Sequence, residues 1–88
     1  MKVIKIGAAG CPGCVIMKPR WQEIEQENPW LDAEYFDADE QKDKIKKYNL
    51  DELPTFIFLD QTEVEITRKK GIVSKSALLE LINEHKDK

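Results

Sequence analysis

Cys11 and Cys14 are the only cysteines in this chain of 88 residues, and Pro12 and Gly13 separate them. Two thiols at this spacing can exchange electrons through a reversible disulfide, bind a metal ion or staple the fold. A disulfide across two intervening residues closes a very short loop and removes little entropy from the unfolded chain, so it is a poor staple. The pattern therefore favours redox chemistry or metal binding.

Cys11 lies where a helix is expected to begin. Pro12 suits the first helical position, because a missing N–H costs nothing there, and Cys14, Met17 and Trp21 follow at helical spacing. Unpaired amides and the positive end of the helix dipole stabilise a thiolate at this place. We therefore predict that Cys11 is a nucleophile near neutral pH.

Cys14 lies one helical turn further along the predicted helix, on the same side as Cys11. It belongs to the face that carries Met17 and Trp21, which is expected to be core and to shield the Cys14 sulfur from solvent. A shielded thiol within reach of Cys11 suits a resolving thiol that attacks a mixed disulfide. Gly13 leaves the approach to Cys11 unobstructed.

Seven predicted elements, in the order βαβαββα, position this pair. The strands are expected over Lys2–Gly7, Leu31–Asp37, Thr55–Asp60 and Glu63–Lys69, with a three-residue hairpin loop Asp60-Gln61-Thr62. The helices are expected from Pro12 to about Asn28, from the N-cap Asp39 to Tyr48 with Asn49 as its stop, and from the N-cap Ser74 to a charged tail beginning at Glu84.

The order of these elements predicts the topology of the sheet. A strand, a helix and a second strand imply a parallel crossover, whereas the last two strands form an antiparallel hairpin. The expected architecture is α/β, with a four-stranded mixed sheet flanked by helices on both faces. Residues 1–88 are expected to form a single domain, because the chain is short and shows no linker.

The segment Leu53-Pro54-Thr55 opens the predicted third strand, where a proline is expected in a turn or in the cis form. Together with the Cys-X-X-Cys at the first strand–helix junction and Gly71 after the fourth strand, this segment resembles the thioredoxin superfamily. Pro19 in the first helix and Asp39 after the second strand are similar to that family as well. The resemblance covers nearly the whole chain.

The resemblance implies roles for particular residues. Cys11 carries over as nucleophile, Cys14 as resolving thiol, and Pro54 as a cis proline beside the disulfide. Leu53 would bind an extended substrate segment through its backbone. Pro12, Gly13 and Thr55 complete the substrate-binding residues that we expect.

Two departures from the family concern protein substrates and proton transfer. Gly10 replaces a tryptophan, and the Pro12-Gly13 order is reversed. Lys5 stands where the family has a buried acid, and Tyr35 where it often has a lysine. One hypothesis is that a partly desolvated Lys5 with a lowered pKa accepts the proton of Cys14; the alternative is that Lys5 extends to the sheet edge.

The expected function is that of a thiol-disulfide oxidoreductase that reduces protein disulfides, supports electron transport and cell redox homeostasis, and has no bound cofactor. Gly71 stands alone after the fourth strand, without the paired glycines and acidic residues with which glutaredoxins bind glutathione. We therefore expect a thioredoxin-reductase-like flavoenzyme as reductant. Glutathione stays an alternative, because Cys11-Pro12 is similar to the glutaredoxin motif, and a monomer is expected.

The alternative function is a metal-binding module that uses the same cysteine pair. Zinc needs four ligands, and the only histidine, His85, lies in the charged tail, so a zinc site would require two chains to pool their cysteines. A Cu(I) chaperone would bind through the thiolates. That class has the order βαββαβ and a methionine where this chain has Ala9.

Composition excludes other classes of partner. The net charge is −3, and no basic stripe interleaved with aromatic residues is present, so nucleic acid is not expected. No run approaches the roughly 20 apolar residues of a membrane span. The apolar stretch up to Gly10 is short and contains Lys5, unlike an export signal, so a cytoplasmic location is expected.

Overall fold

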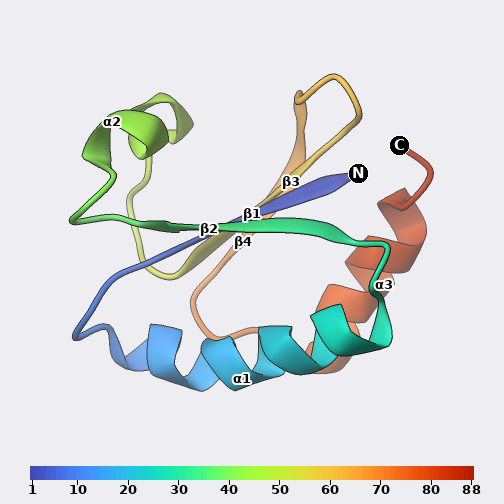
Figure 1. The fold of residues 1–88 in the computed structure, drawn as a ribbon, viewed down its shortest axis with the longest axis horizontal. Coiled ribbons are helices and arrows are strands. Elements are labelled where there is room, and N and C mark those ends of the chain that lie inside the picture. The colour runs from blue at the N-terminus through green and yellow to red at the C-terminus, as the bar shows by residue number, and fades with distance from the viewer.

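The computed structural model describes all 88 residues, and Figure 1 shows the arrangement of its elements. The strands and helices occur in the predicted order βαβαββα, with a short 3-10 helix (η1) added after the second helix. The strands are β1 (Lys2–Gly7), β2 (Asp32–Asp37), β3 (Thr55–Leu59) and β4 (Glu65–Lys70). The helices are α1 (Pro12–Glu27), α2 (Lys42–Ile45), η1 (Lys46–Tyr48) and α3 (Lys75–His85).

The four strands form one mixed sheet in the order β2-β1-β3-β4. β1 and β2 run parallel, while β1 with β3 and β3 with β4 run antiparallel. Lys5 on β1 therefore lies between Tyr35 on β2 and Phe56 on β3. The predicted crossover and hairpin are confirmed, and β1 is an inner strand.

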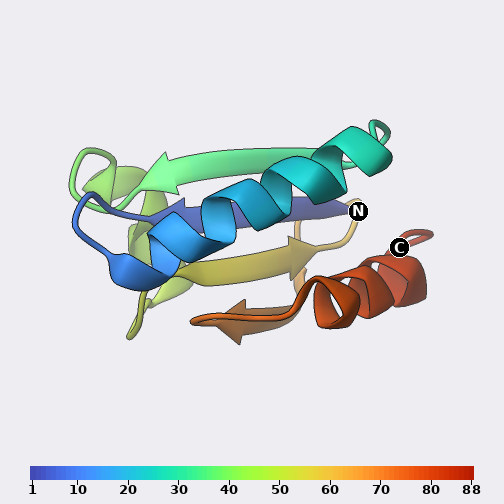
Figure 2. The same ribbon diagram turned by 90° about the horizontal axis from the view of Figure 1, so that it is seen from below.

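The helices lie on both faces of the sheet, as predicted. α1 and α3 cover one face, and α2 with η1 lies on the other (Figures 1 and 2). Alternate β1 residues face opposite layers, because successive side chains of a strand point to opposite sides. Val3 packs with the α1 and α3 layer, whereas Ile4 and Ile6 pack with the α2 layer.

Side-chain caps fix the starts of the two long helices. The Sγ atom of Cys11 accepts a hydrogen bond from the Cys14 N–H at the start of α1, with Pro12 in the first turn. Ser74 Oγ accepts from the Ala77 N–H at the start of α3, which confirms the predicted cap. Pro19 lies inside α1 as expected.

The predicted cap of the second helix is wrong. α2 begins after Gln41, whose side chain accepts from the Asp37 N–H instead of capping the helix. The Asp37 carboxylate accepts from the N–H groups of Asp39 and Glu40, so these residues form a turn. Asn49 adopts the left-handed conformation, with φ of 51°, and ends η1 as predicted.

The hairpin loop is longer than the sequence predicts. β3 ends at Leu59 and β4 begins at Glu65, so Val64 belongs to the loop and is 59% exposed. The Asp60 carboxylate accepts hydrogen bonds from the N–H groups of Thr62 and Val64, and this holds the wider loop.

Two smaller corrections concern element ends. Leu31 is buried but precedes β2 instead of opening it. α3 continues to His85, which is only 8% exposed, so the solvated tail is shorter than expected.

The start of α1 and the two chain ends lie at opposite ends of the molecule (Figures 1 and 2). The Lys88 carbonyl accepts a hydrogen bond of 2.9 Å from the Gln61 N–H, which holds the C-terminus against the hairpin loop. None of the helices combines the length and the apolar character that crossing a lipid bilayer requires.

Candidate functional site

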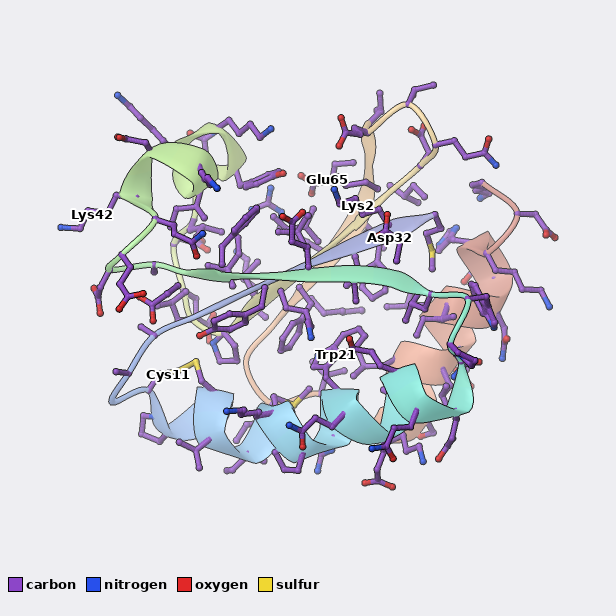
Figure 3. The ribbon with its side chains drawn as sticks, in the orientation of Figure 1. Lys2, Cys11, Trp21, Asp32, Lys42 and Glu65 are labelled. Atoms are coloured by element: carbon purple, nitrogen blue, oxygen red, sulfur yellow. A yellow bond between two sulfur atoms is a disulfide. The ribbon has the colours of Figure 1, made fainter.

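Cys11 and Cys14 form a disulfide at the N-terminal end of α1, with Cα atoms 5.2 Å apart. Figure 3 shows Cys11 at this end of the helix, below the edge of the sheet. The loop from Ala8 to Gly10 connects β1 to Cys11, and Gly10 adopts a positive φ of 80° within it. Glycine reaches that conformation without strain.

One backbone amide donates to the Cys11 sulfur. The Cys14 N–H donates to Cys11 Sγ over 3.3 Å, and this amide belongs to the first turn of α1. Such amides and the helix dipole favour a negative charge on the sulfur once the disulfide is reduced. The local geometry is therefore that of a stabilised thiolate.

Cys14 points into the protein. It lines a cavity of about 520 Å³ that Lys5, Trp21 and Tyr35 also line, whereas Cys11 does not. A Cβ atom at Gly7 would lie 3.0 Å from Cys14 Sγ, so the missing side chain leaves room for the sulfur. The two cysteines thus differ in surroundings, although both are half-buried.

Pro54 lies against the turn between the cysteines. The Leu53–Pro54 peptide bond is cis, as the resemblance implied, and Pro54 is buried. A Cβ atom at Gly13 would lie 3.0 Å from Pro54 Cδ, so glycine permits this close approach. The structure therefore brings Gly13 and Pro54 together beside the disulfide.

The remaining expected substrate-binding residues differ in exposure. Pro12 is exposed at the start of α1, and Leu53 is half-buried. The N–H and C=O of Leu53 have no intramolecular hydrogen-bond partner. Thr55 is fully buried, and its hydroxyl donates to the Glu52 carbonyl, so its side chain holds the turn before β3.

Lys5 lies on the inner strand β1, and its side chain extends towards α1. Its Nζ atom donates to Glu25 over 2.7 Å, and its side chain is 15% exposed. Nζ also lies 5.9 Å from the centroid of the Trp21 ring, which extends from α1 towards the sheet (Figure 3). Lys5 is thus an ion-paired residue in the wall of the cavity that Cys14 lines.

Tyr35 lines the same cavity as Lys5 and Cys14. A Cβ atom at Gly7 would lie 3.2 Å from the Tyr35 hydroxyl, so this hydroxyl and the Cys14 sulfur both border Gly7. Burial, and then the charges of Asp37 and Glu40, raise the pKa of Tyr35 above its ordinary value. The phenol therefore keeps its proton at neutral pH.

Sequence reasoning missed three residues of this region. Gly7 ends an ordinary β-prone run, and nothing local marks it as a contact of Cys14. Glu25 and Arg20 lie on α1 among other charged residues, and only the tertiary fold shows that Glu25 binds Lys5 and that Arg20 donates to the Val73 carbonyl.

The copper-binding alternative requires the order βαββαβ, and the observed order differs from it. No group of three or more histidine, cysteine or acidic side chains is arranged to hold a metal ion. His85 lies at the C-terminal end of α3, far from the start of α1 (Figure 1).

Comparisons with known proteins agree on one class. The thioredoxin family model matches residues 1–84. A curated thioredoxin of Bacillus subtilis is 33% identical over 79 residues, which cover 89% of this chain and 75% of the relative.

Solved structures agree with this match. A thioredoxin of Thermosipho africanus superposes with a TM-score of 0.84 at 29% identity, covering 99% of this chain and 96% of the other. A thioredoxin of Nicotiana alata superposes with a TM-score of 0.86 at 26% identity, covering 94% and 70%.

Fold and site together define a thioredoxin-like protein with a disulfide at the first strand–helix junction. The chain belongs to the thioredoxin family. Members of this family are protein-disulfide oxidoreductases, and the Cys11–Cys14 pair gives this chain the corresponding redox group.

Proposed function

We propose that this protein reduces protein disulfides, with Cys11 as nucleophile and Cys14 as resolving thiol. The Cys11 thiolate attacks one sulfur of a substrate disulfide, and the other substrate sulfur leaves as a thiolate. Cys14, after losing its proton, attacks Cys11 Sγ and releases the second substrate thiolate. The substrate gains two electrons, and the Cys11–Cys14 disulfide forms.

One observation carries this assignment. The first-turn amide of Cys14 points at the Cys11 sulfur, while Cys14 itself lines the cavity bordered by Lys5, Trp21 and Tyr35. A thiolate at Cys11 is stabilised, and the thiol behind it is positioned to attack. This difference supports the two roles.

The substrate-binding residues stay part of the proposal. The unpaired N–H and C=O groups of Leu53 lie next to Pro54 and are available to an extended substrate segment. Pro12 and Gly13 border the approach to Cys11, and Thr55 supports the turn that presents Leu53. An exposed peptide edge can pair with a substrate strand in this way.

We expect the reductant to be a thioredoxin-reductase-like flavoenzyme, with glutathione as the other candidate. The test is a redox titration of the cysteine pair together with insulin reduction, using either a thioredoxin reductase with NADPH or glutathione as electron source. Turnover that depends on the reductase supports the proposal. Turnover with glutathione alone would reassign the reductant, and stoichiometric Cu(I) binding without turnover would contradict the proposed function.

We also propose that Lys5 takes part in removing the Cys14 proton. Lys5 lines the cavity that Cys14 also lines, and its Nζ atom is ion-paired with Glu25 over 2.7 Å.

The variant Lys5→Met tests this role. We expect oxidation of the reduced protein by a substrate disulfide to slow about tenfold near neutral pH, a modest loss for proton transfer. The oxidation rates of Lys5→Met and of the unchanged protein should become equal at high pH, where Cys14 is already a thiolate. Lys2→Met is the matched control, because Lys2 is ion-paired on the same strand and faces the other layer. Rates that are unchanged at every pH would remove Lys5 from the mechanism.

A further inference from the structure

Residues 71–73, called the 71–73 loop, lie between the end of β4 and the N-cap Ser74 of α3, and Ile72 lies beside Gly13 in the cysteine turn. The Gly71 N–H donates to the Pro54 carbonyl over 2.8 Å, which fixes one end of the loop. Ile72 comes next, and its Cγ1 atom would lie 3.7 Å from a Cβ atom at Gly13. This apolar side chain is nevertheless 59% exposed, so it forms part of the surface around the disulfide.

Two side chains of α1 fix the other end of the loop. Arg20 Nη1 donates to the Val73 carbonyl over 2.7 Å, and the Val73 N–H donates to Met17 Sδ over 3.4 Å. Arg20 Nη1 also lies 3.6 Å from Met17 Sδ as a donor. Both backbone polar groups of Val73 are therefore bound by the helix that begins at the cysteine pair.

We propose that Arg20 is a positioning residue that holds the 71–73 loop so that Ile72 forms an apolar contact for protein substrates next to Cys11. The proposal rests on the proposed function and adds to it a determinant of substrate affinity. The occupant is an extended protein segment with an apolar side chain near its disulfide.

The geometry explains why one arginine can have this effect. Gly71 is free to adopt many backbone conformations, and it has a φ of 74° here, so the loop needs anchors on both sides of Ile72. A hydrogen bond from a charged group is stronger than a neutral one. With Arg20 in place, the loop is ordered before the substrate arrives, and binding does not have to supply that ordering.

Arg20 lies two helical turns away from the sulfur chemistry. It contacts neither cysteine and does not line the cavity behind Cys14. Its loss is therefore expected to change the affinity for large substrates and to leave the thiol–disulfide equilibrium as it is. This separation distinguishes loop positioning from a role in catalysis.

The test compares Arg20→Met with Arg68→Met. Methionine keeps most of the aliphatic stem but removes the donors. Arg68 is the only other arginine, and it binds Glu65 on β4. For Arg20→Met we expect the KM for insulin to rise about tenfold. A loss of affinity of this size is what removal of one hydrogen bond to a charged group produces. The kcat, the equilibrium with glutathione and the rate with the small disulfide 5,5′-dithiobis(2-nitrobenzoate) should stay within about twofold.

Two further measurements identify the mechanism. Amide hydrogen exchange at Val73 should accelerate in Arg20→Met and not in Arg68→Met. Arg20→Lys keeps a charged donor and should restore most of the affinity for insulin. Arg68→Met should behave like the unchanged protein in every assay.

The outcomes separate this proposal from the proposed function. If the unchanged protein does not reduce insulin at all, the proposed function fails. If it does, and Arg20→Met keeps the same KM or shifts the glutathione equilibrium as much as the KM, only the role of Arg20 is overturned. Amide hydrogen exchange at Val73 that is as slow in Arg20→Met as in the unchanged protein would likewise overturn the positioning role.

Discussion

Cys11→Ser is expected to lower the rate of disulfide reduction by more than about 10³-fold, as loss of a nucleophile does in other enzymes. A serine hydroxyl at the start of α1 stays protonated at neutral pH, so the first-turn amides cannot make it an effective nucleophile. The measurement is insulin reduction with dithiothreitol as electron source.

Cys14→Ser is the matched variant, and its expected failure is different. Cys11 still attacks the substrate, but nothing resolves the mixed disulfide, so a stoichiometric covalent complex accumulates. That complex is visible by mass spectrometry and is released by added thiol. Limited alkylation of the reduced protein should label Cys11 before Cys14, because the first-turn amide favours the thiolate of Cys11. Labelling of Cys14 first, or full turnover of Cys14→Ser, would contradict the assigned roles.

Phe58→Ala is expected to lower the free energy of unfolding by about 3–5 kcal/mol, the usual cost of truncating a buried aromatic side chain. Phe58 is fully buried on β3, and its ring centroid lies 6.4 Å from that of Trp21. A loss of this size is a large part of the roughly 5–15 kcal/mol that stabilises a typical protein. Urea unfolding of the oxidised protein measures it.

Two controls bracket this expectation. Phe58→Leu keeps most of the apolar volume and should cost less than the alanine variant. Val64→Ala removes an exposed side chain of the hairpin loop and should change stability by no more than about 0.5 kcal/mol. Similar losses for Phe58→Ala and Val64→Ala would show that β3 is not the centre of the core.

Local sequence signals predicted much of the fold. Ser74 predicted the start of α3, Pro12 predicted the start of α1, and Asn49 predicted the end of η1, because each acts through its own neighbouring backbone. The order of strands and helices then predicted the mixed sheet. The cis bond at Pro54 came from the family resemblance and is also present in the structure.

Misplaced boundaries came from competition between neighbouring polar residues. Asp39 has the side chain of a helix cap, but the Asp37 carboxylate binds the local amides, and α2 begins only after Gln41. Val64 fits an alternating strand pattern, but Asp60 binds its N–H and keeps it in the loop. A single sequence does not show which carboxylate binds the neighbouring backbone amides.

Contacts within the site were the least predictable part, because they join residues far apart in the chain. Lys5 and Glu25 are 20 residues apart, and Arg20 and Val73 are 53 residues apart. Both pairs depend on how α1 lies across the sheet, which no local pattern fixes. The partner of Lys5 could therefore be identified only from the structure.

Because both chain ends lie at the far end of the molecule from the cysteine turn, a tether at either end keeps the reactive sulfur facing outwards (Figure 1). Protein immobilised on an electrode or a bead through its N-terminus would present a uniform redox-active surface. Substrates diffusing from solution would reach it without obstruction by the support.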